Sequence, residues 1–315
     1  MPRSPFPSPR RSLALLLPAA LLVLTACGED SSADDDGGSA SGGDGSFPVT
    51  VSSDAGEITL DDRPEAIVSL SATATEMLFA IGADDQVVAV DDTSNFPSGV
   101  PTTDLSAYTP NAEAIVGFAP DLVVLSDDIN GIVDALETLD VPVLMLPAVD
   151  DLEGSYDQLR LLGEATGNGD GADDVVADIQ ERIDAAVASV DGAGEGRRVY
   201  HELDPSFYSA DSTTFIGSVY ALFGLENVAD GASGDNDGYP QLSAEYVVGQ
   251  APELIVLADT VCCGESAATV AQRPAFDTVP AVQQGRILEA SDDVASRWGP
   301  RIAEFTESVA AALDG

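Results

Sequence analysis

One segment of the chain occurs twice, and this repeat constrains the fold more than any other feature. From Glu113 the sequence reads EAIVGFAPDLVVLSD, and from Glu245 it reads EYVVGQAPELIVLAD, with nine of the fifteen positions identical. Each copy contains a residue that can cap a helix (Asn111 or Ser243), a glutamate in the first turn, an Ala-Pro step and an apolar run. An apolar run of this length is typical of a strand covered by helices on both faces. Two such copies predict two lobes of similar construction.

The rest of the chain alternates short apolar runs with helical patterns, which is typical of a parallel α/β architecture. We expect an edge strand or a hairpin at 49–60 and a helix at 76–81 that opens with a capping box from Thr73 to Glu76. The segment 291–298 reads as a loop. Further strands are expected at 66–70, 86–90, 142–146, 199–203 and 286–289, and further helices at 131–139, 151–166, 213–223 and 301–313.

The segment 170–191 has apolar residues at helical spacing over about six turns, with glycines on both sides. We interpret it as a stiff connector between the lobes. The predicted fold is therefore two Rossmann-like α/β lobes joined by a single long interlobe helix, with the ligand cleft between the lobes. The predicted domains are a signal peptide at 1–26, a tether at 27–47, a first lobe at 48–168, the interlobe helix at 169–193 and a second lobe at 194–315.

The N-terminal residues have the pattern of a targeting segment. Three arginines precede an apolar run at 13–24 that is too short to span a bilayer. The run ends in Leu-Thr-Ala-Cys, which resembles a bacterial lipobox and predicts lipid on Cys27. An Asp/Gly/Ser-rich stretch follows that cannot form a core. We expect an extracytoplasmic protein, lipid-anchored to the outer face of the cell membrane.

The composition excludes several functional classes. The chain has 55 acidic and 12 basic residues, a net charge of −43 and no lysine. Such a charge argues against nucleic acids and anionic membrane surfaces as partners. The absence of lysine excludes a Walker A lysine and Schiff-base chemistry. His201 is the single histidine, so we predict no metal site and no catalytic role, although a secreted α/β hydrolase with His201 as base is kept as an alternative.

Aromatic residues gather in the segments that follow the predicted strands, where open α/β sheets bind their ligands. These candidate ligand-binding residues are Tyr108, Phe207, Tyr208, Tyr239 and Trp298. An apolar cleft with few charges suits a large planar or macrocyclic ligand. Cys262 and Cys263 are adjacent and follow the second repeat strand, so we expect them to face the cleft as well. Outside the cell a vicinal disulfide is our hypothesis for them, with free thiols or bonds to another chain as alternatives.

Over residues 58–313 the chain resembles the Fe³⁺-siderophore/cobalamin class of substrate-binding proteins of ABC importers, and most closely its vitamin B12-binding members. The resemblance is carried by RPEAIVSLSATATEMLFAIGADDQVVAV, by the repeated core and by SRWGPRI near the C-terminus. It implies that Glu113 and Glu245, one on each lobe, dock into the permease. It also adds Asp293 and Arg297 to the ligand-binding residues. Thr93 and Ser126 stand where the B12 binders have Tyr and Trp, which leaves the ligand open.

We therefore expect a monomeric solute-binding lipoprotein that delivers a ferric siderophore or a corrinoid to an ABC permease and its ATPase. No cofactor of its own is expected, because the metal chelate is the transported ligand. A haem-binding receptor is an alternative if His201 or Tyr208 reaches iron. An adhesive module is a third class, but it would not require paired aromatic loops.

Overall fold

The structure is a computed structural model that describes residues 46–232 and 237–314. The described residues belong to one compact unit, Gly42–Gly315. The predicted signal peptide, Cys27 and nearly all of the predicted tether lie outside the described residues. Within the described part of the chain, no helix combines the length and the apolar character that crossing a membrane requires.

The first lobe is built on a parallel sheet with the strand order β4-β3-β5-β6. Its central strands are buried along their whole length, as expected for a sheet covered on both faces. The predicted hairpin is present as β1 (Val49–Ser53) and β2 (Gly56–Leu60). The sheet strands are β3 (Ile67–Leu70), β4 (Val87–Val90), β5 (Leu122–Leu125) and β6 (Val143–Met145).

The second lobe repeats this topology with the strand order β10-β9-β7-β8. Each sheet thus has four parallel strands, and in each the strand of the repeat copy is a central one that pairs with the first strand of the same sheet. The strands of this sheet are β7 (Arg198–Glu202), β8 (Glu226–Asn227), β9 (Leu254–Leu257) and β10 (Ile287–Glu289). The matching strand order confirms the prediction of two lobes of similar construction.

The two repeat copies form matching helix–strand units. The first copy gives α2 (Ala112–Val116) and β5, and the second gives α7 (Ala244–Gln250) and β9. The predicted caps are present, because the side chains of Asn111 and Ser243 each accept a hydrogen bond from a backbone amide three residues further on. Each helix is followed by an Ala-Pro step whose alanine has a φ of 50°.

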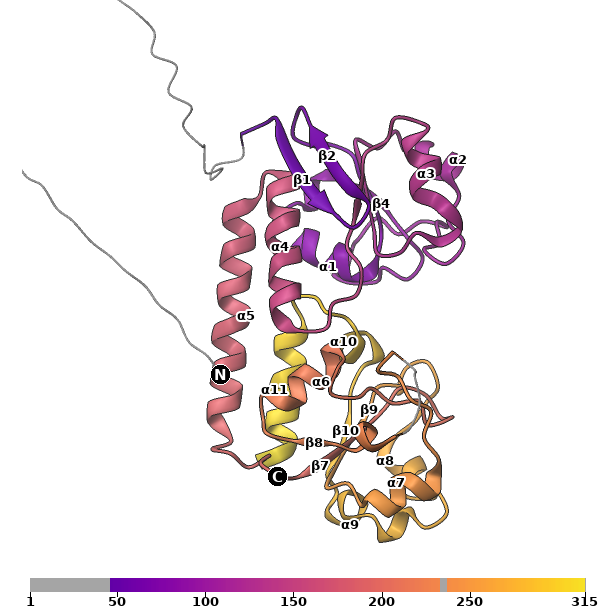
Figure 1. Ribbon diagram of the computed structural model, residues 1–315, viewed down its shortest axis with the longest axis vertical. Coiled ribbons are helices and arrows are strands. Elements are labelled where there is room, and N and C mark those ends of the chain that lie inside the picture. Colours follow the sequence, from indigo (N-terminus) through magenta and orange to yellow (C-terminus); the bar gives the residue numbers. More distant parts are fainter. Residues whose placement is uncertain (1–45, 233–236, 315) are drawn as a thin grey trace, which may run out of the picture. The chain divides into compact units, whose positions relative to one another are not determined.

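One long helix runs beside two others (Figure 1). The predicted connector is α5 (Gly169–Ser189), which follows the first sheet in the chain and precedes the second. It packs against α4 (Leu152–Thr166) and α11 (Ile302–Asp314). Its buried face contributes to a core cluster that contains residues of both sheets. The domain limits derived from the sequence stay predictions.

The remaining elements are short. They are the α-helices α1 (Ala72–Ala80), α3 (Ile132–Glu137), α6 (Phe215–Ala221), α8 (Ala267–Val270), α9 (Pro280–Gln284) and α10 (Asp292–Ser296), and the 3-10 helices η1 (Asp84–Gln86), η2 (Ile129–Gly131), η3 (Val228–Gly231) and η4 (Phe276–Thr278).

Two local expectations were wrong. Helix α1 begins at Ala72 and is capped by Ser71, whose Oγ accepts from the Ala74 amide at 3.2 Å, so Thr73 and Glu76 form no capping box. The segment expected to be a loop at 291–298 contains α10. In the first case the chain turns into the helix directly after β3. The Glu76 side chain is then directed into the protein, where it binds two arginines.

Candidate ligand-binding site

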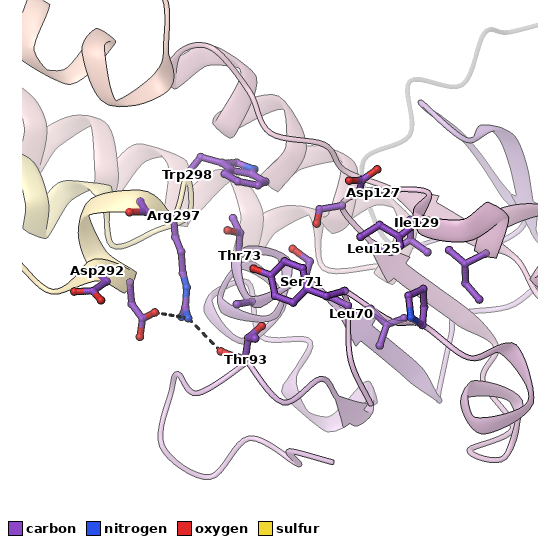
Figure 2. Close-up of a pocket in the computed structure, with 18 residues that line it drawn as sticks. Leu70, Ser71, Thr73, Thr93, Leu125, Asp127, Ile129, Asp292, Arg297 and Trp298 are labelled. Carbon is purple, nitrogen blue, oxygen red and sulfur yellow. Dashed lines mark hydrogen bonds and ion pairs between the residues drawn. The ribbon is translucent and has the colours of Figure 1, made fainter. Parts of the chain in front are cut away.

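A pocket of about 450 Å³ lies at the carboxyl ends of β3 and β5. Its other wall is the segment that begins with α10 and ends at Trp298. Ligands of open α/β sheets bind outside the carboxyl ends of the strands, because the helix–strand connections diverge there. The pocket therefore has the position that the fold predicts, and it is lined by residues of both lobes (Figure 2).

The first-lobe side of the pocket rests on a buried hydroxyl network. Thr75 Oγ1 is 2.9 Å from both Ser69 Oγ and Ser94 Oγ, and Ser94 donates to Asp91. Thr93, which lines the pocket, donates to the other oxygen of Asp91 at 2.7 Å. These bonds connect the end of β3, helix α1 and the loop after β4. The network therefore fixes the position of the pocket residues on this side.

Arg297 extends along the pocket wall toward Thr93 (Figure 2). Its guanidinium donates to Glu76 at 2.6 Å, to Asp293 at 2.6 Å, to Asn95 Oδ1 at 3.0 Å and to the Thr93 carbonyl oxygen at 3.2 Å. Only 11% of its side chain is exposed. The predicted ligand residue Arg297 is therefore at the pocket, but its charge is balanced by two carboxylates.

Glu76 is the residue of this site that the sequence interpretation missed. Its side chain is 1% exposed and also accepts two hydrogen bonds from Arg301, at 2.8 and 2.5 Å. A buried carboxylate requires such partners, because leaving it unpaired costs several kcal/mol. Two sequence features could have identified Glu76. It is the single charged residue of its helix, and two arginines stand four residues apart in SRWGPRI.

The predicted aromatic residues fall into two groups. Tyr108 and Trp298 line the pocket; Tyr108 is 72% exposed, and Trp298 is held by α4 through Nε1–H to Gln158 at 2.8 Å. Phe207, Tyr208 and Tyr239 are not among the lining residues. Tyr208 and Tyr239 are exposed elsewhere.

Phe207 packs within the second lobe. Its ring lies 6.3 Å from that of Phe276 and faces the Arg273 guanidinium at 5.2 Å.

Partial burial raises the pKa of Tyr239, and the carboxylates of Asp150 and Asp211 raise it further. The structure therefore brings four of the predicted ligand residues to one pocket: Tyr108, Asp293, Arg297 and Trp298.

Glu113 and Glu245 are the first-turn acids of α2 and α7 and are both exposed. In the part of the chain that the structure describes, neither carboxylate forms an ion pair. A carboxylate in the first helical turn is favoured by the helix dipole, by about 0.3–1 kcal/mol. The two acids thus occupy corresponding positions on the two lobes, and both side chains are exposed to solvent.

Cys262 and Cys263 are joined in a vicinal disulfide in an exposed loop. The expectation that they face the cleft is not met, because neither lines the pocket. They are nevertheless connected to it, since the amides of Val261 and Cys262 donate to the pocket residue Asp292 at 3.0 and 2.7 Å.

His201 is fully buried in β7. Its Nδ1 lies 2.6 Å from the Tyr220 hydroxyl, and burial lowers its pKa to about 3. A pKa this low makes the imidazole a weak base, its burial keeps it from a substrate in solvent, and it does not line the pocket. Neither the hydrolase alternative nor the route to haem iron through His201 is supported by this environment. No cluster of metal-ligating side chains is found among the described residues.

The chain matches the family model of the periplasmic binding proteins over residues 67–294. It is 32% identical to a cobalamin-binding protein of Halobacterium salinarum, in an alignment that covers 82% of this chain and 72% of the relative. An uncharacterised ABC transporter substrate-binding lipoprotein of Bacillus subtilis is 29% identical, with 85% and 86% covered.

The solved structure of a periplasmic haem-binding protein from Roseiflexus sp. RS-1 in its apo form is similar, with a TM-score of 0.69 and 22% identity. The alignment covers 80% of this chain and 98% of that structure. At this identity the match reports the fold and not the ligand. The family match includes both sheets and the pocket residues up to α10. The chain belongs to the periplasmic binding protein family.

Proposed function

We propose that this protein is the extracytoplasmic solute-binding component of an ABC importer and that its ligand is a corrinoid. The observation that carries the proposal is the 32% identity to a protein named as a cobalamin-binding protein, across both lobes. The pocket supports it, since Tyr108 and Trp298 offer apolar surface and the Arg297 charge is already balanced. A catecholate siderophore complex, which is strongly anionic, would need unpaired cations.

The permease and its ATPase are the proposed partners, and Glu113 and Glu245 are the proposed docking residues. Both are exposed at corresponding helix N-termini, so one arginine-lined pocket on each half of a permease could accept them. Binding through two such contacts also favours one orientation of the receptor. A monomer presents one acid from each lobe and requires no second copy.

The anchor is proposed to be lipid on Cys27, with the acidic stretch behind it as a flexible tether. This proposal rests on the lipobox pattern and places the protein on the outer face of the cell membrane. The wild type should incorporate a labelled fatty acid in growing cells, and Cys27→Ser should not. A wild type that takes up no label would refute lipid anchoring at this residue.

Ligand binding is tested by titrating the purified protein with cyanocobalamin, ferrichrome, ferrioxamine B and haemin, and by measuring each Kd by calorimetry. We expect the tightest binding for cyanocobalamin. A ligand present at 100 times its Kd also raises the free energy of unfolding by about 2.7 kcal/mol, so thermal unfolding gives an independent readout. Binding of haemin or ferrichrome alone would reassign the ligand, and no binding of any probe would refute the proposed function.

Docking is tested with the double variant Glu113→Ala/Glu245→Ala in a strain that depends on this importer. We expect uptake to be lost while the Kd for the ligand is unchanged, since neither residue lines the pocket. The matched control is Glu137→Ala/Glu181→Ala, which removes two exposed acids from α3 and α5. Uptake equal to that of the control would show that the two glutamates have no role in docking.

A further inference from the structure

The pocket has an uneven charge. Among the described residues that line it, Asp127, Asp292 and Asp293 carry carboxylates, and Arg297 is the only cation. Two oxygens of Asp292 accept amide hydrogen bonds from the disulfide loop, while Asp127 is exposed. The formal charge that a ligand meets is therefore negative, unless Arg297 turns its guanidinium toward the ligand.

Arg297 has almost no capacity left for a ligand. A guanidinium has five N–H donors, four of them on the two terminal nitrogens. One terminal nitrogen donates to Glu76 and Asn95, and the other donates to Asp293 and the Thr93 carbonyl. All four terminal donors are in use. The paired N–H groups with which arginine grips a carboxylate or phosphate are consequently not available to an anionic ligand.

The arrangement is held from behind the pocket wall by Glu76. This carboxylate is buried and binds Arg297 and Arg301 together, and Arg301 also lies over the Phe96 ring at 4.3 Å. Asn95 adds a second connection, because its side-chain amide donates to Asp293 at 2.7 Å while its oxygen accepts from Arg297. Moving Arg297 toward the ligand would break these bonds and leave Glu76 buried beside a single cation.

We propose that Glu76 and Asp293 form a charge filter: they hold Arg297 turned away from the ligand, so that the pocket favours a neutral or cationic metal complex over an anionic one. The inference rests on the proposed function, because it concerns the ligand of the same pocket. Glu76 acts here as a positioning residue, and Asp293 contributes its charge directly. The ligand class is a large metal chelate with a net charge of zero or above.

The test uses ligands of nearly equal size that differ in charge. Aquocobalamin carries one positive charge at about pH 6, cyanocobalamin is neutral, and the monocarboxylic acid derivatives of cyanocobalamin are anionic. Ferrioxamine B and ferrichrome form a second pair, cationic and neutral. For the wild type we expect the cation to bind more tightly than the neutral ligand, and the anion least tightly. One unit charge at about 10 Å changes Kd roughly three- to fifteenfold.

Asp293→Asn removes one carboxylate from the pocket without changing its size, and Glu76→Gln removes the carboxylate behind the wall. Each variant should lower the preference for the cation over the neutral ligand roughly threefold or more. The matched control, Asp134→Asn, removes an exposed acid of α3 and should leave the preference unchanged. The ratio of two Kd values measured on one variant cancels any loss of folded protein. If Glu76→Gln fails to fold, Asp293→Asn alone tests the inference.

The outcomes separate this inference from the proposed function. Binding of either series with the expected order of charges, together with a loss of preference in Asp293→Asn, supports the charge filter. Binding without discrimination, or a change in Asp293→Asn no larger than in Asp134→Asn, overturns the filter and leaves the proposed function standing. No binding in either series refutes both.

Discussion

Replacing Asp259 by Asn should stabilise this protein more strongly at pH 8 than at pH 5. Asp259 follows β9, is fully buried, and has no hydrogen-bond partner for either carboxylate oxygen among the described residues. It faces Glu202, which is also buried and already accepts from Arg273 and from the Tyr200 hydroxyl. Burial, and then the negative charge of Glu202, raise the pKa of Asp259 to about 7.

The sign and the size of the effect follow from proton linkage. A carboxyl whose pKa is raised in the folded state keeps its proton there and releases it on unfolding, so its stabilising contribution is present at low pH. This contribution is lost as the pH rises through about 7, where Asp259 loses its proton beside the buried carboxylate of Glu202. Between pH 5 and pH 8 the wild type should lose about 2 kcal/mol, and at most about 3, through this group. The amide of the Asp259→Asn variant cannot ionise, and it can donate to Glu202.

The assay is urea denaturation of the wild type and Asp259→Asn at pH 5 and pH 8 at constant ionic strength. We expect the variant to gain about 2 kcal/mol relative to the wild type between the two values. The comparison with a variant is needed because buried His201 acts in the opposite direction: its lowered pKa reduces stability as the pH falls below about 6.5. The control is Asp127→Asn, at the corresponding but exposed position of the first repeat copy. A difference between variant and wild type that does not change with pH would refute the reasoning.

Two further predictions concern packing and surface charge. Gly171→Ala should destabilise the protein by roughly 1–3 kcal/mol, because the added Cβ would collide with the Ile81 carbonyl oxygen where α5 passes the end of α1. The control is Gly169→Ala, which has open space at its Cβ position. Equal urea midpoints for the two variants would contradict the prediction. Added NaCl should raise the unfolding temperature, since a net charge of −43 repels itself and salt screens it; a scan from about 0.05 to 1 M that shows no rise would contradict this.

The elements that could be predicted from the sequence are those whose signals are local. The repeat copies contain their own caps, helix turns and apolar strands, so α2–β5 and α7–β9 formed where expected. The long helix α5 was equally clear from its apolar spacing. The similar construction of the two sheets then follows from the repeat, because equal units in the same chain order build similar sheets.

The parts that could not be predicted depend on residues far apart in the chain. Glu76 fitted a capping box by its spacing from Thr73, but Ser71 took the cap, and Glu76 found partners more than two hundred residues away. Helix α10 is held by the disulfide loop through Asp292, a contact that no local pattern indicates. Phe207 was predicted to contact the ligand because it lies in a polar loop. In the structure its ring packs against Arg273 and Phe276 instead.

The repeat also explains why the two lobes contribute unequally to the pocket. Asp127 and Asp259 end the same fifteen-residue segment in the two copies. In the first lobe the strand ends stay open, and Asp127 faces the pocket. In the second lobe the strand ends are closed by a buried ionic cluster of Glu202, Arg273 and Asp259. The second lobe lines the pocket through α10 and Trp298 instead, and this segment brings Arg297 within hydrogen-bond distance of Glu76.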